Sequence, residues 1–134
     1  MSKRIEDSFA RQAMMETLGA SLAEIAEGKV VITAPILPTC TQQHGYGHAG
    51  LTFSLGDSAA GYAALTLMPE EKEVLTAEMK INLLAPAKGD YLRATGKVVK
   101  PGRRLMVVSA EVEAIDGDKV TPVAVLQGTM IPVG

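Results

Sequence analysis

Residues 48–67, HAGLTFSLGDSAAGYAALTL, are small or apolar almost throughout and contain a single formally charged residue at pH 7 with His neutral, Asp57. The apolar residues fall on every side of a helix rather than on one stripe, which is typical of a helix that is buried all round. An ionised carboxylate removed from water is costly unless a partner compensates. The sequence therefore predicts a long buried helix over about residues 49–67, with one carboxylate that is either partnered or functional.

The second half of the chain has the pattern of an antiparallel sheet. Residues 74–86 alternate apolar with polar residues, the period of a half-buried strand. We expect the apolar set to face the core: Leu75, Ala77, Met79, Ile81 and Leu83. Three more strands are predicted over 90–100, 104–115 and 119–131, because turn-forming residues separate them at 100–103 and 116–117. Consecutive strands joined by tight turns form a meander.

The first 36 residues are predicted to form one helix and two strands. Residues 6–18 have apolar residues at helical spacing, with Asp7 or Ser8 as the N-terminal cap and Gly19 as the end. Residues 20–26 and 29–36 are taken as strands that meet at a corner at 27–28, although helix propensity also allows 20–27 to continue the helix. The whole chain, residues 1–134, then forms a single α+β domain whose sheet wraps one buried helix.

Composition excludes several classes of function. The 134-residue chain has a net charge of -2, no Trp and no basic block, so a nucleic-acid-binding surface is not expected. Cys40 is the only cysteine, which excludes an internal disulfide or a multi-thiolate zinc site and fits a reducing compartment. No signal-peptide core or membrane-length apolar run is present, so we expect a cytoplasmic protein without a membrane contact.

Two segments resemble a known family. The first is His48-Ala49-Gly50 at the entrance of the predicted helix, followed by Asp57 nine residues after His48. The second lies within 77–112 and includes INLLAPAKGDYLRATGKVVKPGRR. Together, over residues 8–132, the chain resembles the hotdog-fold acyl-CoA thioesterases and is most similar to their phenylacetate-pathway (PaaI-like) branch. The resemblance implies a hotdog fold, in which five to six antiparallel strands wrap the helix over 49–67 and an N-terminal helix lies outside.

The resemblance also implies roles for four residues. Asp57 would activate the attacking water or attack the thioester itself, and the backbone N–H of Ala49 would donate to the thioester oxygen. Gln42 occupies a position where many PaaI-like enzymes have Asn, so the amide function is kept. Thr76 matches a Ser/Thr position that helps to hold the water. Ala49 itself replaces the more usual Gly.

Elementary chemistry supports two of these roles and adds a constraint. A helix N-terminus supplies free N–H groups for a developing oxyanion, and a desolvated Asp57 is a suitable base. Asp57 lies eight residues after Ala49, or about 12 Å along a helix. Both groups must lie within roughly 3 Å of adjacent reacting atoms, so one helix cannot supply both. The spacing predicts an active site shared by two copies in a homodimer or a homotetramer.

Further residues are candidates for binding and catalysis. Lys100, Arg103 and Arg104 cluster at a turn and are candidates for binding the phosphates of coenzyme A. His48 is expected to cap the helix entrance and is kept as a catalytic candidate. His44 and His48 lack a third ligand, so no metal is predicted. No cofactor is expected either, since coenzyme A is part of the substrate.

Two further side chains, Ser58 and Cys40, are not expected to act as nucleophiles. Gly56-Asp57-Ser58 has the letters of a serine hydrolase motif, but Ser58 is predicted to be buried in mid-helix with no positioned His. Cys40 shows no feature that would activate it and is read as an ordinary thiol. The favoured function is thus hydrolysis of acyl-CoA or aryl-acyl-CoA thioesters. The alternatives are a non-catalytic acyl-CoA-binding or regulatory module, or a hotdog hydratase or dehydratase, whose His–carboxylate signature is absent from this sequence.

Overall fold

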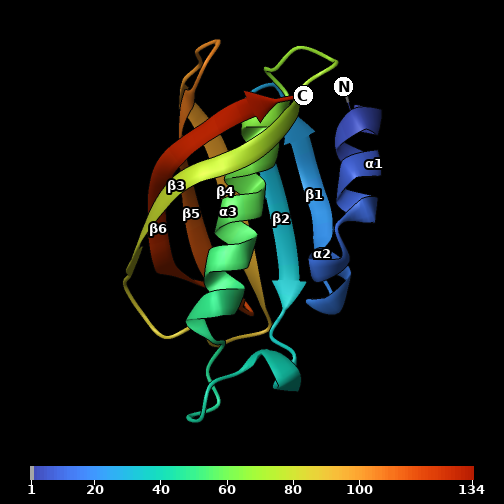
Figure 1. Cartoon of the computed structure of the whole chain (residues 1–134). Helices are drawn as coiled ribbons and strands as arrows, with labels where there is room; N and C mark the ends of the chain where they lie inside the picture. Colours follow the sequence, from blue (N-terminus) through green and yellow to red (C-terminus); the bar gives the residue numbers. More distant parts are fainter. Residues whose placement is uncertain (1) are drawn as a thin grey trace.

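One curved sheet wraps a single central helix in the computed structural model, which describes residues 2–134. All strands are antiparallel, in the order β1-β2-β4-β5-β6-β3. In Figure 1 the sheet curls around α3, β3 and β6 pass along one side of it, and α1 and α2 lie beside β1. The elements are α1 (Ser2–Arg11), α2 (Ala13–Thr17), β1 (Ser21–Ala26), β2 (Lys29–Pro35), η1 (Pro38–Cys40), α3 (Ala49–Leu65), β3 (Glu73–Leu83), β4 (Tyr91–Lys100), β5 (Met106–Asp116) and β6 (Lys119–Val133).

This arrangement confirms the α+β hotdog fold and the buried helix predicted from residues 48–67. Small side chains allow the helix to lie close to the sheet: Ala59, Ala60, Ala63 and Ala64 are fully buried in α3. Gly96 of β4 faces Ala59, and any Cβ at position 96 would overlap the Ala59 backbone. The approach of α3 to β4 therefore depends on small residues on both elements.

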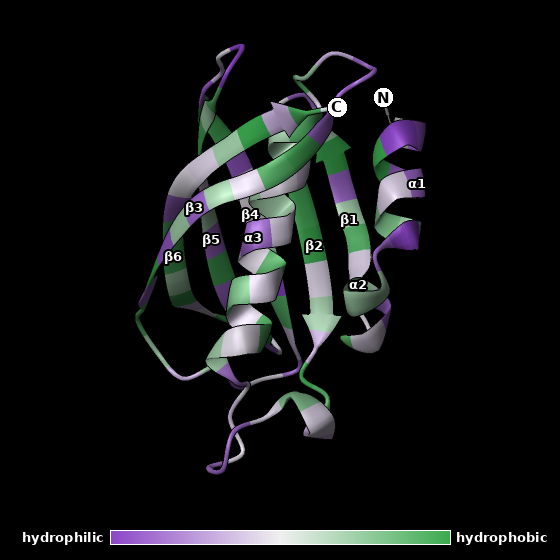
Figure 2. Ribbon diagram, in the orientation of Figure 1, coloured by the Kyte–Doolittle hydropathy of each residue, from purple (hydrophilic) through white to green (hydrophobic). Residues whose placement is uncertain are grey.

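The predicted strands and corners are also present. β1 and β2 meet at Gly28, and β5 and β6 meet at Gly117, both of which have positive φ angles, of 73° and 60°. Figure 2 shows hydrophobic colour along much of β2 and hydrophilic colour at the tip of the β4–β5 hairpin. No helix formed by residues 2–134 has both the length and the apolar character needed to span a bilayer.

The N-terminal helix differs from its prediction. It begins at Ser2 rather than at residue 6, so Asp7 and Ser8 lie inside α1 and cap nothing. It is broken at Gln12, whose ψ of 95° is extended, before α2 resumes. The Gln12 side chain is hydrogen-bonded to α3, at Tyr62 and Ser58. We attribute the break to these contacts, since the helical pattern of the sequence runs through this point without interruption.

The predicted alternation of β3 is wrong in its first half and at its last residue. A β-bulge lies between Thr76 and Glu78, where β3 pairs with β6. The bulge inserts one residue and reverses which side chains face inward. Consequently Thr76, expected to point outward, reaches the central helix, and Leu75, expected in the core, is 56% exposed. Met79 and Ile81, beyond the bulge, pack against the core as predicted. Leu83, at the end of β3 and also expected in the core, is 55% exposed.

Arg4 fixes the N-terminal helices to the end of α3. Its guanidinium donates hydrogen bonds to the backbone carbonyls of Leu65, Met68, Pro69 and Lys72, at 2.6 to 3.2 Å. The last carbonyls of a helix have no partner within the helix and must be satisfied from outside. Arg4 supplies such partners and so holds α1 against α3.

Candidate active site

Asp57 lies half-buried in the middle of α3 and is held by Thr76 of β3. The Thr76 hydroxyl donates to Asp57 Oδ1 over 2.7 Å. Within residues 2–134, Oδ2 of Asp57 has no hydrogen-bond partner and no cation pairs with the carboxylate. Burial raises the pKa of the Asp57 carboxyl above its ordinary value, and the Thr76 hydrogen bond lowers it by a smaller amount. The structure thus brings together two of the predicted residues and leaves one carboxylate oxygen free.

A cavity of about 340 Å³ opens beside Asp57, which we call the Asp57 pocket. Its volume is within the range of small-molecule sites. β3, β6, α3 and α1 contribute to it, together with Gln12, which follows α1. Its lining consists of Ser8, Arg11, Gln12, Asp57, Ser58, Gly61, Tyr62, Glu73, Val74, Thr76 and Met130.

A second cavity of about 340 Å³ lies at the N-terminus of α3, which we call the Ala49 pocket. It contains Gln42, His48 and Ala49, together with Leu83 at the far end of β3. Three predicted site residues therefore lie together, in a pocket that contains neither Asp57 nor Thr76.

His48 caps α3, as predicted. Its Nδ1 accepts a hydrogen bond from the Gly50 N–H over 2.7 Å, which consumes that helix donor. An imidazole nitrogen that accepts carries no proton, so Nε2 of the neutral ring carries it. The Ala49 N–H has no partner among the residues from Ser2 to Gly134. Ala49 is therefore the free backbone donor at the positive end of the helix, and it faces the Ala49 pocket.

Gln42 orients its amide by contacts within its own loop. Its Oε1 accepts from the backbone N–H of His44 at 2.6 Å and from that of Tyr46 at 3.3 Å. Because Oε1 is the acceptor in both bonds, the Nε2 group is the end of the amide that remains available as a donor. Gln42 and Ala49 thus supply one pocket with a side-chain and a backbone N–H.

The remaining candidates lie outside both pockets or play other parts. Lys100, Arg103 and Arg104 occupy the exposed tip of the β4–β5 hairpin. Ser58, predicted to be buried, is half-buried and donates to Gln12. Cys40 is half-buried in η1. In the part of the chain from residue 2 onward, no three His, Cys, Asp or Glu side chains are grouped as a metal site.

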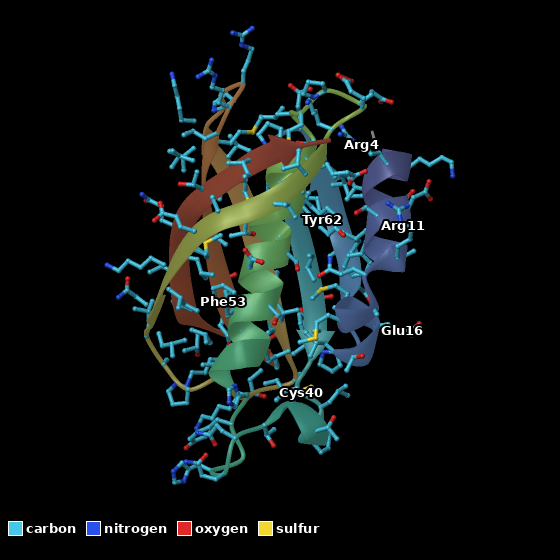
Figure 3. All side chains as sticks on the ribbon, in the orientation of Figure 1. Arg4, Arg11, Glu16, Cys40, Phe53 and Tyr62 are labelled. Atoms are coloured by element: carbon cyan, nitrogen blue, oxygen red, sulfur yellow. The ribbon has the colours of Figure 1, made fainter. Side chains whose placement is uncertain are left out.

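The Asp57 pocket also contains residues that the sequence analysis did not assign to the active site. Gln12 Nε2 donates to the Tyr62 hydroxyl at 3.0 Å, and Ser8 Oγ lies 3.2 Å from the same hydroxyl. Ser58 donates to Gln12 Oε1. These side chains are as much as 54 residues apart in the chain, and no local pattern marks them as neighbours. Figure 3 shows Tyr62 on α3 on the side where α1 carries Arg11.

The comparisons with known proteins all indicate the same family. Residues 44–121 match the thioesterase superfamily. A solved thioesterase family protein from Silicibacter pomeroyi is 42% identical with a TM-score of 0.96, covering 98% of this chain and 97% of that one. The PaaI protein from the phenylacetic acid degradation operon of Escherichia coli is 25% identical with a TM-score of 0.87, covering 98% and 92%. The sequence named acyl-coenzyme A thioesterase PaaI, from E. coli K12, is 28% identical over 105 residues, which cover 78% of this chain and 73% of the relative.

Proposed function

This chain belongs to the thioesterase superfamily and is a PaaI-like thioester hydrolase, and we propose that it hydrolyses acyl-CoA or aryl-acyl-CoA thioesters at a site that two copies build together. The observation that carries the proposal is the separation of the two halves of the site. Within one chain the carboxylate and the free N–H donor occupy different pockets. Thioester hydrolysis needs both at one carbonyl group.

The chemistry follows from the groups in each half. The Ala49 N–H, assisted by Gln42 Nε2, stabilises the negative charge that develops on the thioester oxygen. Asp57 Oδ2, which is free, takes a proton from a water as the water oxygen attacks the thioester carbon, or attacks that carbon itself. Thr76 orients Asp57 through Oδ1 and leaves its own oxygen lone pairs free for the water. The carbon–sulfur bond then breaks, and the CoA thiolate leaves and is protonated. Where Asp57 itself attacks, this step leaves an anhydride between the acyl group and the Asp57 carboxyl, and a water then hydrolyses it to release the acid and restore the carboxylate.

The edge strand β3 supports a two-copy site. β3 is the last strand of the sheet, so one row of its backbone N–H and C=O groups has no partner strand within residues 2–134. The Asp57 pocket includes Glu73, Val74 and Thr76 near the start of β3, and the Ala49 pocket includes Leu83 at its end. Antiparallel pairing of two copies of β3 about a two-fold axis places the start of one strand beside the end of the other. Each Asp57 pocket then faces an Ala49 pocket of the second copy.

Side chains near the middle of β3 suit such pairing. A two-fold axis near Met79 sets Glu78 of each copy opposite Lys80 of the other. Opposite charges across an antiparallel pair are favourable. Leu75 and Leu83, near the two ends of the strand, are 56% and 55% exposed, and a second copy would cover them. Covering exposed leucines is a favourable hydrophobic contribution to association.

Substrate hydrolysis and assembly can be tested together. We expect the wild-type protein to release free thiol from at least one member of a panel of short, medium and aryl acyl-CoAs. We also expect it to sediment as a dimer or a larger oligomer, with specific activity that falls as dilution dissociates it. A protein that binds acyl-CoA but releases no thiol would instead be a binding module. Full activity in a dilute monomer would contradict the shared site.

For the nucleotide of CoA we propose the β4–β5 hairpin tip, because it carries three exposed cations. Changing Lys100, Arg103 and Arg104 together to Ser is expected to raise KM for an acyl-CoA about tenfold, since each exposed pair with a phosphate contributes modestly. The control substrate is the thioester of the same acyl group with N-acetylcysteamine, which carries no phosphate. The KM for this substrate is expected to stay unchanged. An equal rise in KM for both substrates would show that the tip does not contact the nucleotide.

A further inference from the structure

We propose that the Asp57 pocket is the acyl subsite, with Gly61 as its floor and Ser8 and Tyr62 as a hydrogen-bonding end wall. The pocket would select acyl chains that carry a neutral hydrogen-bond acceptor at the far end. This inference rests on the proposed thioester hydrolysis and names the acyl class for the same site. Four of the lining residues, Ser8, Gln12, Gly61 and Tyr62, carry it.

One of the two hydroxyl hydrogens in the end wall, which Ser8 and Tyr62 supply, is left without an acceptor within residues 2–134. The Tyr62 oxygen accepts from Gln12 Nε2, and the Ser8 and Tyr62 hydroxyls contact each other over 3.2 Å. Two hydroxyls have two hydrogens, and their mutual contact uses one of them. The other hydrogen has no acceptor in the chain from residue 2 to 134. A ligand oxygen that reaches the wall can accept it, whereas a plain alkyl end would leave it unpaired.

Gln12 holds the wall in place. Its Oε1 is occupied by the Ser58 hydroxyl, so its Nε2 is directed to Tyr62. The Tyr62 ring packs against Phe9 with centroids 6.2 Å apart, and Arg4 fixes α1 to the end of α3. The donor is thus presented by fixed groups, and a ligand does not have to order it.

The helix spacing gives the length of the acyl group. Gly61 follows Asp57 by four residues and so lies on the same face of α3, without a side chain to block the path. Tyr62 lies five residues after Asp57, so its backbone is roughly 7.5 Å further along the helix axis, and an extended acyl chain of about six carbons is the length that we match to this rise. A six-carbon chain is therefore the length with which the end wall is tested.

Charge at the pocket favours a neutral acceptor. Asp57 and Glu73 supply two carboxylates and Arg11 one cation. None of these three forms an ion pair within residues 2–134. The net charge of these three side chains is negative, so a terminal carboxylate on the acyl chain would be repelled. A hydroxyl or keto oxygen is accepted at no such cost.

The test compares kcat/KM for hexanoyl-CoA, 6-hydroxyhexanoyl-CoA and adipoyl-CoA, with acetyl-CoA as a chain too short to reach the wall. We expect the wild-type enzyme to prefer the hydroxylated chain over hexanoyl-CoA by about tenfold, the order of one neutral hydrogen bond. Adipoyl-CoA is expected to be the poorest of the three long substrates. The double variant Ser8→Ala/Tyr62→Phe keeps the ring that packs on Phe9 and removes both hydroxyls. Its preference is expected to fall to about twofold or less.

Gly61→Ala tests the floor independently. A Cβ at position 61 would lie 3.7 Å from Met130 Cε, an ordinary contact, so the fold is expected to tolerate it. We expect hydrolysis of both six-carbon substrates to fall while acetyl-CoA hydrolysis is kept. Ser54→Ala, on α3 but outside the pocket, is the matched control and is expected to match wild type.

The end wall, the floor and the proposed thioester hydrolysis would each be contradicted by a different experimental result. A wild-type ratio near one, or a ratio that the double variant leaves unchanged, overturns the end wall, with thioester hydrolysis intact. A Gly61→Ala variant that keeps wild-type rates on six-carbon chains overturns the floor. Absence of hydrolysis of every acyl-CoA would instead contradict the proposed function itself.

Discussion

Asp57→Asn is expected to lower kcat/KM for the best acyl-CoA substrate by on the order of 10²-fold or more, the loss typical of an acid–base group. Asn has the same shape and its Oδ1 can still accept from Thr76, whose hydroxyl bonds Asp57 Oδ1 in the native protein. The variant removes only the ability to take a proton or to attack carbon. Thiol release with wild type and variant side by side measures the effect. A variant with more than a tenth of wild-type activity would assign Asp57 a structural role.

The raised pKa of the Asp57 carboxyl predicts how activity depends on pH and how Asp57→Asn changes stability. The carboxylate loses its charge as the pH falls through the raised pKa, so kcat/KM of the wild type is expected to decline at a pH above that of an ordinary Asp and to be level above it. The ionised Asp57 carboxylate also destabilises the folded protein. This destabilisation is absent at a pH below the pKa of Asp57 in the unfolded chain and complete at a pH above its pKa in the folded protein. Asp57→Asn removes this destabilisation, so at neutral pH it is expected to unfold at no lower denaturant concentration than wild type.

Ala49→Pro is expected to reduce kcat by roughly 10²-fold, the scale of a lost oxyanion donor. Proline is favoured at the first position of a helix, where its missing N–H is unpaired in any case. His48 precedes it with φ −63° and ψ 144°, the extended backbone that a following proline requires. The change therefore deletes the free donor and keeps the helix. Gly50 cannot compensate, because His48 occupies its N–H.

Mixing the two inactive variants tests the shared site. In a dimer of one Asp57→Asn chain and one Ala49→Pro chain, one site combines an intact Asp57 with an intact Ala49 of the other chain. Random pairing makes half of the dimers mixed, so co-refolded chains are expected to recover about one quarter of wild-type activity. If each chain contained its own complete site, the mixture would stay as inactive as its parts. Circular dichroism and sedimentation of each variant alone confirm that both fold and assemble.

Local pattern was enough to predict much of this fold. The apolar residues around Asp57 cover every side of a helix, which indicates a helix that is buried all round. The existence of this helix and its burial could therefore be predicted from the sequence. Gly28 and Gly117 mark tight corners because they supply positive φ. The expectation that Ala49 and Asp57 act from different copies also came from local geometry, since eight helical residues fix their separation.

Other features depend on contacts between distant segments. The bulge after Thr76 arises where β3 pairs with β6, and it turns Thr76 toward Asp57 against the period of the strand. The break at Gln12 coincides with its hydrogen bonds to α3, which propensity does not include. The sequence by itself determined the buried helix, the strands that follow it along the chain and the distance between Ala49 and Asp57 along that helix, because these follow from periodicity and backbone rise. Only the tertiary structure decided which side chains line each pocket, because strand register and helix docking are set by packing between residues far apart in the chain.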